Sequence, residues 1–335
     1  MTNILELRAS ELDDAIKKQT IHSRNIDVDK WLKNNDLSAQ VKSATSWLDE
    51  IYQNYVDPEK TDDAVMPWSK TQEDVKFRLG EVTVYAGSNG GGKSLVTGQI
   101  ALGLIKQDQK VCIASYEMKP VTTIIRMLRQ FAGENINIPL THDKEGYIRG
   151  ILGRFTNFID DNLYLYDQQG STTAHKTIAM ARYCAVELGV KHIFIDSLMK
   201  CVSGEDALNE QKSFVDELCA LARDHNVHIH LVHHIRKLQS EEIQPGKTDL
   251  KGSGSIADQV DNVFLVWRNK KKENARRNNE DYDEKQPDMF LMCQKQRNGE
   301  AEEFYGLYFE HNSQQFIEVQ GGQPMDFDNR GAFRA

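Results

Sequence analysis

Near residue 76 the pattern of apolar and polar positions changes from polar and helix-prone to a regular alternation of two textures. Short runs of β-branched and aromatic residues alternate with longer runs of helical periodicity, such as those at 171–188 and 209–225. The short runs, which we predict to be strands, are 81–87, 110–116, 163–167, 192–196, 227–234 and 262–268. Strands that alternate with helices in this way predict an α/β fold with a mostly parallel sheet flanked by helices.

The two flanks of this region differ from it. Residues 1–75 are predicted to form a short N-terminal helical arm and linker, because the apolar residues of 38–52 share one helical face that needs another surface to pack against. Towards the other end, 289–311 is predicted to form two antiparallel edge strands, and 321–335 a flexible tail. We therefore expect an arm, a main domain at 76–320 and a tail.

Composition and charge argue against a general duplex-DNA-binding protein, a membrane protein and a secreted protein. The chain carries 50 acidic against 41 basic residues, a net charge of −9, which argues against binding duplex DNA through the overall field and leaves only a local basic cluster for nucleic acid. No apolar run is long enough to span a membrane and the N-terminus lacks a secretory signal pattern, so we expect a cytoplasmic protein. The five cysteines show no CxxC spacing and are expected to be reduced, buried thiols.

A glycine-rich stretch, "YAGSNGGGKSL" at 85–95, follows a predicted strand and precedes a predicted helix. It fits the P-loop pattern GxxxxGK[ST], in which bare backbone N–H groups and a helix N-terminus cradle phosphate oxygens. Lys93 is expected to reach the β- and γ-phosphates, and Ser94 to offer its hydroxyl to Mg²⁺. The residues predicted to line this site for ATP, or for another NTP or dNTP, are Gly87, Ser88, Asn89, Gly90, Gly91, Gly92, Lys93, Ser94 and Leu95.

Two carboxylates are predicted to belong to the same site. Asp196 ends the strand 192–196, where the carboxyl ends of parallel strands gather ligands, and it is expected to hold Mg²⁺ through water. Glu117 follows the strand after the P-loop helix and can polarise the attacking water. For each carboxylate the alternative is a solvated turn residue. A carboxylate placed one strand after the P-loop is typical of RecA-like ATPases rather than of small GTPases or kinases.

The segments "SYEM", "HIFIDSLMK", "HLVHHIRK", "TDLKGSGSIADQVDNVFLVWRN" and "KQRNG" follow the P-loop in this order. Together they resemble the ATPase domain of hexameric replicative DNA helicases of the DnaB type, in particular those of bacteriophages and the mitochondrial helicase Twinkle. The resemblance covers roughly residues 76–318 and implies a RecA-like P-loop NTPase core. It also implies an ATP-dependent ring helicase that translocates 5′ to 3′ on single-stranded DNA and unwinds the duplex during DNA replication.

The resemblance assigns roles to further residues. His234 falls where the family keeps a γ-phosphate sensor, and His233 stays open as the alternative because strand alternation turns only one of the two toward the nucleotide. Arg297 matches the arginine finger that reaches a neighbouring subunit's ATP, and Lys295 matches the lysine that accompanies it. The residues implied to contact the adenine or ribose are Arg268 and His311.

DNA contact is implied for two polar loops, one after Asp196 and one after His234. The second loop can present basic side chains and N–H groups to the phosphates of a single strand without reading its sequence, although a solvated connecting loop is the alternative. Its predicted DNA-binding residues are Arg236, Lys237, Lys247, Lys251, Gly252, Ser253 and Gly254. The basic run at 269–279 is balanced by acidic neighbours and is expected to be a solvated hairpin tip instead.

The resemblance also implies partners. It predicts a homo-oligomer, most simply a six-membered ring in which the N-terminal arm packs on the adjacent subunit, with a separate primase, polymerase or loader. Two other classes share the core: a RecA- or RadA-like recombinase that forms filaments, and a regulatory RecA-fold ATPase. The segment "KGSGSIADQVDNV" favours a helicase over the first, and the joint presence of Glu117, His234 and Arg297 argues against the second.

Overall fold

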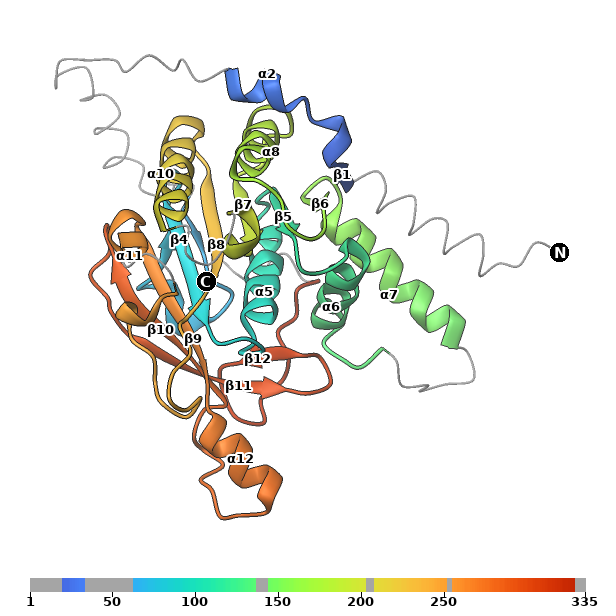
Figure 1. The fold of residues 1–335 in the computed structure, drawn as a ribbon. Coiled ribbons are helices and arrows are strands. Elements are labelled where there is room, and N and C mark those ends of the chain that lie inside the picture. The colour runs from blue at the N-terminus through green and yellow to red at the C-terminus, as the bar shows by residue number, and fades with distance from the viewer. Residues whose placement is uncertain (1–19, 34–62, 137–143, 203–207, 252–254, 329–335) are drawn as a thin grey trace, which may run out of the picture.

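The computed structural model describes residues 20–33, 63–136, 144–202, 208–251 and 255–328 (Figure 1). Its strands are β1 (Thr20–His22), β2 (Ala64–Val65), β3 (Lys76–Phe77), β4 (Val82–Gly87), β5 (Val111–Ser115), β6 (Leu163–Asp167), β7 (His192–Asp196), β8 (His228–His234), β9 (Asn262–Arg268), β10 (Met289–Gln296), β11 (Phe304–Glu310) and β12 (Gln315–Ile317). In this part of the chain they form one ten-stranded sheet, ordered β1-β6-β5-β7-β8-β4-β9-β10-β11-β12, and a separate β2-β3 pair.

The sheet confirms the predicted α/β class. All six predicted strands are present as β4 to β9, each within one residue of its predicted limits. Neighbouring strands from β1 to β9 pair in parallel, and those from β9 to β12 pair antiparallel, as predicted for the edge strands. Every residue of β4, β5 and β7 is buried, which is why these strands are continuous apolar runs without polar alternation.

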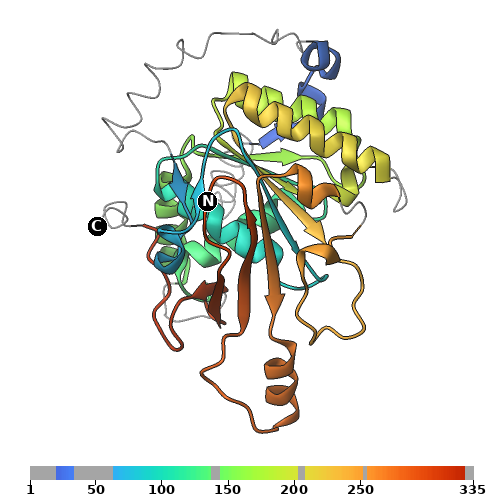
Figure 2. The same cartoon turned by 90° about the vertical axis from the view of Figure 1, so that its left-hand side faces the viewer.

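Helices cover both faces of the sheet (Figure 2). Their bounds are α2 (Val28–Lys33), α4 (Ser69–Gln72), α5 (Lys93–Lys106), α6 (Pro120–Ala132), α7 (Lys144–Ile159), α8 (Ala174–Glu187), α9 (Leu198–Cys201), α10 (Leu208–His225), α11 (Ser255–Gln259) and α12 (Lys270–Asn278). Buried side chains of α8 and α10, such as Ile178 and Phe214, pack in one core cluster. Those of α5 and α6, such as Ile100 and Phe131, pack in the other.

Two described segments of the predicted arm pack on the main domain of their own chain. The strand β1 extends the sheet by pairing in parallel with β6, and α2 packs on α8, where Trp31 O accepts a hydrogen bond from Arg182 Nη1 at 2.9 Å. Further along, the buried Trp68 donates from Nε1 to Phe316 O at 2.7 Å. Neither contact was predicted, and the helix predicted at 38–52 lies outside the described residues.

The prediction of a flexible tail at 321–335 is wrong for its described part, 321–328. Phe327 is fully buried, and Lys106 Nζ donates to Asp326 O. Met325 N donates to Gln315 Oε1 at 2.7 Å, and Gln315 Nε2 donates back to Met325 O at 3.1 Å. The burial of an aromatic side chain outweighs the loop-like composition of this segment.

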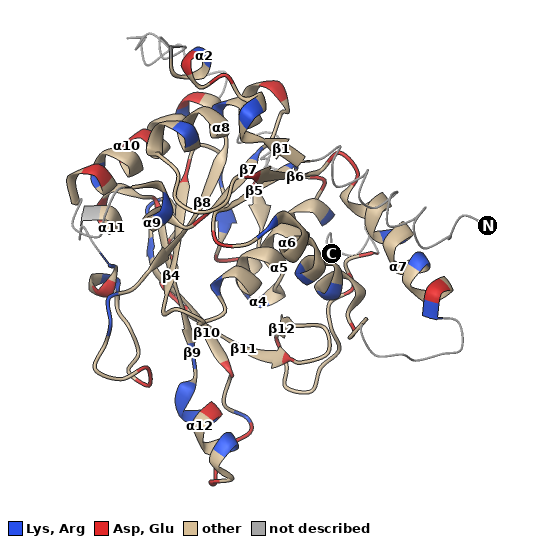
Figure 3. Cartoon of the chain, turned by 45° about the vertical axis from the view of Figure 1, so that its right-hand side comes forward, with Lys and Arg blue, Asp and Glu red and all other residues tan. Residues whose placement is uncertain are grey.

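The expectation of a solvated hairpin tip at 269–279 agrees with the structure, in which most side chains of this stretch are exposed or half-buried. This stretch joins the antiparallel strands β9 and β10 and folds into α12, in which Lys and Arg lie beside a glutamate (Figure 3). The Asn269 side chain caps its start by accepting from Lys272 N, and Asn279 ends it with a left-handed φ of 55°. Lys272 is buried, with its Nζ 2.8 Å from Asp288 Oδ1.

Two further observations concern the cysteines and the possibility of a membrane-spanning helix. All five cysteines are free and buried in the structure. Across the described ranges, no helix has the length and apolar character needed to cross a lipid bilayer.

Three fully buried histidines lie side by side on β7 and β8. His192 Nδ1 is 3.2 Å from His230 Nε2, and His228 Nε2 is 2.8 Å from Thr83 Oγ1. The ring of Phe77 packs edge-on against two of them, with centroids 5.1 Å from His228 and 4.8 Å from His230. Burial lowers the pKa of all three, and it lowers the pKa of His228 to about 4.

The buried histidines predict that stability falls as the pH falls. An unfolded histidine has a pKa near 6.5 and takes up a proton below it, whereas a buried one stays neutral until the pH approaches its lowered pKa. The stabilisation is therefore complete above pH 6.5 and is lost toward pH 4. We expect the free energy of unfolding to drop by roughly 2 kcal/mol from His228 alone between about pH 7 and 5, measured by urea unfolding.

Two variants test whether the pH dependence of stability comes from the buried histidines. His228→Gln should remove that part of the pH dependence, whereas His175→Gln, at an exposed position, should leave it unchanged. An identical pH dependence in both variants and the parent would contradict the role of the buried cluster.

Candidate functional site

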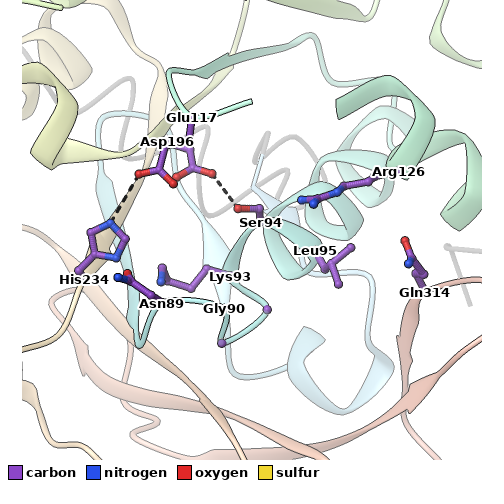
Figure 4. Close-up of a pocket in the computed structure, with 12 residues that line it drawn as sticks. Asn89, Gly90, Lys93, Ser94, Leu95, Glu117, Arg126, Asp196, His234 and Gln314 are labelled. Carbon is purple, nitrogen blue, oxygen red and sulfur yellow. Dashed lines mark hydrogen bonds and ion pairs between the residues drawn. The ribbon is translucent and has the colours of Figure 1, made fainter. Parts of the chain in front are cut away.

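Four neighbouring strands deliver residues to one cavity of about 380 Å³ (Figure 4). The strand β4 leads into the P-loop, and Glu117, Asp196 and His234 lie at or just past the ends of β5, β7 and β8. These strands are parallel, so their carboxyl ends meet at the same edge of the sheet. The predicted site residues that line this cavity are Asn89, Gly90, Gly91, Gly92, Lys93, Ser94, Leu95, Glu117, Asp196 and His234.

Two P-loop glycines are required by the backbone. A Cβ on Gly87 would lie 2.5 Å from Val266 O, so only glycine lets β4 end this close to β9. Gly92 has a φ of 92° and stands at the N-cap of α5, where it has no side chain to cap the helix. No capping side chain therefore competes with an anionic ligand for the N–H groups of Lys93 and Ser94 at the start of α5.

Buried charges meet in the cavity. Lys93 Nζ donates to Gly87 O at 3.0 Å and Ser88 O at 2.8 Å. Burial lowers the pKa of Lys93, and the nearby carboxylates of Asp196 and Glu117 oppose this shift. Burial likewise raises the pKa of Asp196, against the hydrogen bond from Ser94. Both shifts indicate a cavity of low dielectric, in which charges on a ligand interact strongly with the protein.

The donor set fits a magnesium ion. Ser94 Oγ donates to Asp196 Oδ2 at 2.8 Å, so a hydroxyl and a carboxylate oxygen stand side by side at the start of α5. Mg²⁺ prefers oxygen ligands and takes most of them from water and substrate phosphates. It therefore does not need many protein ligands. Among the described residues, no group of three or more His, Cys, Asp or Glu is arranged to hold a metal.

Glu117 and His234 face each other across the cavity. Glu117 Oε1 accepts from Ser197 Oγ at 3.2 Å and lies 3.7 Å from His234 Nε2. Burial and the positive charge of Lys93 lower the pKa of His234, while Glu117 opposes the shift. A neutral imidazole has one N–H to donate and one nitrogen to accept, so it can respond to a phosphate without carrying a fixed charge.

The structure separates the two candidate sensor histidines. His234 lines the cavity, and 19% of its side chain is exposed. His233 is fully buried, its Nε2 lies 2.5 Å from Lys251 O, and burial lowers its pKa to about 4. Side chains alternate along β8, so only His234 reaches the cavity.

Sequence reasoning missed two residues of the cavity, Arg126 and Gln314. Arg126 lies on α6, and its charge opposes the rise that burial causes in the pKa of Asp196. The apolar face of α6, which includes Ile124 and Met127, places Arg126 off the core, but periodicity does not reveal which cavity it then faces. Gln314, just before β12, carries no sequence signal that we can identify.

A second cavity of about 210 Å³ shares the P-loop glycines with the first. Arg268 and His311, both implied to contact the base or ribose, line it. Arg268 Nε is 3.1 Å from Glu273 Oε2 on α12, and the His311 ring stands edge-on to Phe309 with centroids 5.0 Å apart. The structure thus brings these two residues together beside the P-loop, next to the phosphate cavity.

This fold and site agree with the comparisons. The family model of the DnaB-like helicase C terminal domain matches residues 75–318, close to the predicted extent of 76–318. The chain belongs to this family. It is accordingly an ATP-hydrolysing DNA helicase of replication.

Two solved structures share the fold. One is a DnaB-like replicative helicase described with its interactions with primase, with a TM-score of 0.66 and 16% identity over 87% of this chain and 70% of that chain. The other is the ATPase domain of a second protein, with a TM-score of 0.66 and 18% identity over 84% of this chain and 100% of that chain.

In this DnaB-like helicase, Arg297 and Lys295 lie away from the cavities that hold the other predicted site residues. Strand β10 runs antiparallel to β9, so Gln296 pairs with Asn262 at the end of β9 opposite to Arg268. Arg268 lies on the P-loop side of the sheet, and Arg297 therefore lies at the opposite edge. The pair contacts α11 and Asp261 instead of the P-loop.

The predicted DNA loop of the helicase borders a third cavity of about 650 Å³, which also includes Ser88, Asn89 and His234. Arg236 forms an ion pair with Asp249, with Nη2 and Oδ1 2.6 Å apart, so its charge is matched within the loop. Two more predicted residues of the loop, Lys237 and Lys251, line this cavity. Lys247 lies in a short 3-10 helix (Lys247–Asp249). The other predicted residues lie outside the described part of the chain: Gly252, Ser253 and Gly254.

The two adjacent histidines predict opposite phenotypes. His234→Ala removes a donor from the cavity and should lower kcat for ATP by about 100-fold, with little change in Tm. His233→Ala breaks a buried hydrogen bond and should lower the free energy of unfolding by about 1–3 kcal/mol while the folded enzyme keeps its kcat. Steady-state ATPase assays and thermal unfolding check both, and the reverse assignment of phenotypes would overturn the choice of His234.

Proposed function

We propose that this helicase works as a homohexameric ring that encircles single-stranded DNA, moves along it 5′ to 3′ and unwinds forked duplex at the expense of ATP. The observation that carries the proposal is the separation of Arg297 and Lys295 from the cavity of their own chain. A complete hydrolytic site then needs the cavity of one subunit and the basic pair of the next. Such a head-to-tail contact repeats from subunit to subunit and can close into a ring.

The residues of one cavity divide the work of hydrolysis. Lys93 exchanges its contacts with the Gly87 and Ser88 carbonyls for β- and γ-phosphate oxygens. Ser94 and Asp196 hold Mg²⁺, which when bound neutralises phosphate charge. Glu117 accepts a hydrogen bond from the attacking water and takes its proton.

The remaining charge of the transition state is assigned to cations of this chain and its neighbour. Hydrolysis develops negative charge on the γ-phosphate oxygens, and the Arg297 guanidinium of the adjacent subunit donates to them. Arg126, which lines the same cavity, contributes a second guanidinium from within the subunit. Because one of the two arrives in trans, hydrolysis depends on assembly.

Coupling to DNA follows from chain connectivity. His234 ends β8, and the predicted DNA loop begins at the next residue. A γ-phosphate that accepts a hydrogen bond from His234 holds the end of β8, and its release frees the loop to shift. Lys237, Lys247 and Lys251 are assigned to the phosphates of the single strand, which makes binding independent of base sequence.

The second cavity is assigned to the base and ribose. Arg268 stacks or donates from one side, and His311 faces the base from the other. Neither side chain reads a single base, so both ATP and other NTPs or dNTPs fit this assignment.

Partners and location complete the proposal. A chain that carries the motor still needs primers and loading, so we assign a separate primase, polymerase or loader as its partners. Replication takes place where the chromosome is, which places the helicase in the cytoplasm, and in that of the host if it belongs to a bacteriophage. A RecA- or RadA-like filament and a regulatory ATPase remain the alternatives that the experiment below distinguishes.

Strand displacement on forked duplexes tests the proposal. We expect unwinding that needs ATP, Mg²⁺ and a 5′ single-stranded tail, with no unwinding of a duplex that carries only a 3′ tail. Lys93→Ala, which removes the phosphate-binding ammonium, should abolish unwinding and serves as the blank.

The same assay separates the alternatives. ATP hydrolysis that rises with single-stranded DNA without unwinding, together with filaments in electron micrographs, would favour a recombinase-like motor. Hydrolysis that ignores DNA would favour a regulatory ATPase.

A further inference from the structure

The Arg297 guanidinium is held by its own chain. Its Nη1 lies 2.9 Å from Asp261 Oδ1, and its Nη2 donates to Gln259 O at 3.0 Å and Asp258 O at 3.3 Å. The backbone is tied as well, because Arg297 N donates to Asp261 O at 2.9 Å. Even so, 43% of the Arg297 side chain stays exposed, so an outer edge of the guanidinium can meet another molecule.

Asp261 is a rigid support for this contact. Only 7% of its side chain is exposed, and its Oδ2 accepts from Val82 N at 2.9 Å. Its backbone N also donates to Val82 O at 3.1 Å. The bond from Val82 N and the ion pair with Arg297 hold the carboxylate, and two backbone bonds hold Asp261 itself, at the start of β4, the strand that leads into the P-loop. A buried carboxylate that pairs with a guanidinium through a charge-assisted hydrogen bond restricts its orientation.

Lys295 belongs to the same support. Its Nζ donates to Val260 O at 2.7 Å, Ala257 O at 2.8 Å and Asp258 O at 3.0 Å, the carbonyls at and just after the C-terminal end of α11. An ammonium group has three donors, and these three carbonyls use all of them. The carboxyl end of a helix also attracts a cation. Lys295 therefore anchors α11 in this arrangement.

We infer that Asp261 is a positioning residue for Arg297, and that Lys295 anchors α11 in the same support. This inference rests on the proposed function, in which Arg297 acts on the nucleotide of the adjacent subunit. The carboxylate takes one side of the guanidinium and leaves its exposed edge directed outward. Asp261 therefore limits the orientations in which the guanidinium can reach the adjacent nucleotide, and its loss lowers catalysis in the neighbour while its own cavity stays intact.

The first experiment measures the ATPase kinetics and the nucleotide affinity of the Asp261→Asn variant in the full-length ring. An asparagine can still accept from Val82 N, but its amide turns an N–H toward the guanidinium and no longer neutralises it. We expect kcat for ATP to fall between about 10-fold and 100-fold, because a small misplacement of a catalytic group is costly. The KM and the affinity for a fluorescent ATP analogue should stay unchanged, since the nucleotide cavity is remote from Asp261. Asp224→Asn, an exposed carboxylate on α10, is the matched control and should keep the parental kcat.

The second experiment mixes subunits. Lys93→Ala subunits lack a working cavity but keep Arg297 in place, whereas Asp261→Asn subunits keep the cavity. In mixed rings the Asp261→Asn cavity meets a correctly held Arg297, so a 1:1 mixture should hydrolyse ATP faster than the mean of the two separate preparations. Lys295→Met should behave like Asp261→Asn in both experiments, and it serves as the second variant if Asp261→Asn folds poorly.

The outcomes separate the inference from the proposed function. The reference mixture combines Arg297→Ala subunits with Lys93→Ala subunits. If its ATPase rate does not exceed the mean of the two separate preparations, Arg297 does not act in trans, and the proposed function is overturned. Suppose instead that the Arg297→Ala mixture gains activity. If the mixtures of Lys93→Ala with Asp261→Asn and with Lys295→Met then hydrolyse ATP only at the mean rate of their separate preparations, the positioning role is wrong. Parental kcat in Asp261→Asn, or a raised KM with unchanged kcat, would also overturn it.

Discussion

The parallel pairing of β4 with β8 on one side and β9 on the other fixes the geometry of the nucleotide cavity. Gly87 ends β4 with its Cα so close to Val266 O that no Cβ fits between them. The chain must then turn at Gly92 into α5, which aims its N-terminus at the carboxyl edge of the sheet. Asp196 and His234 meet it there because β7 and β8 run in the same direction. One tight backbone contact thereby helps to place the P-loop, Asp196 and His234 around the same cavity.

The reversal of direction after β9 has the opposite effect. Because β10 returns antiparallel, Arg297 and Lys295 are carried to the far edge of the sheet, where Asp261 and the end of α11 receive them. One sheet therefore presents a phosphate cavity at one edge and an exposed guanidinium at the other. We propose that a motor built from such subunits completes its chemistry between neighbours, which links hydrolysis to assembly.

Buried polar groups serve two different purposes along the same strands. At the carboxyl ends, the buried Lys93 and Asp196 keep opposite charges beside the exposed Glu117, where a charged ligand interacts strongly with them. Further back, His192 and His230 are as deeply buried but stay neutral, hydrogen-bonded to each other and packed on aromatic rings. The difference is the supply of counter-charge, which is present at the cavity and absent from the histidine cluster in the described residues.

The sequence by itself determined the elements and chemistry that local pattern encodes. Strands and helices follow from apolar periodicity, and the P-loop, Asp196 and Glu117 follow from spacing at strand ends, because parallel strands bring their carboxyl ends together whatever the loops do. Only the tertiary structure decided which side chains face a given space. It turned His234 rather than His233 into the cavity, brought Arg126 there from α6, buried Phe327 of an apparent tail, and tied Arg297 to Asp261. Each of these depends on contacts between residues far apart in the chain, and neither propensity nor spacing carries that information.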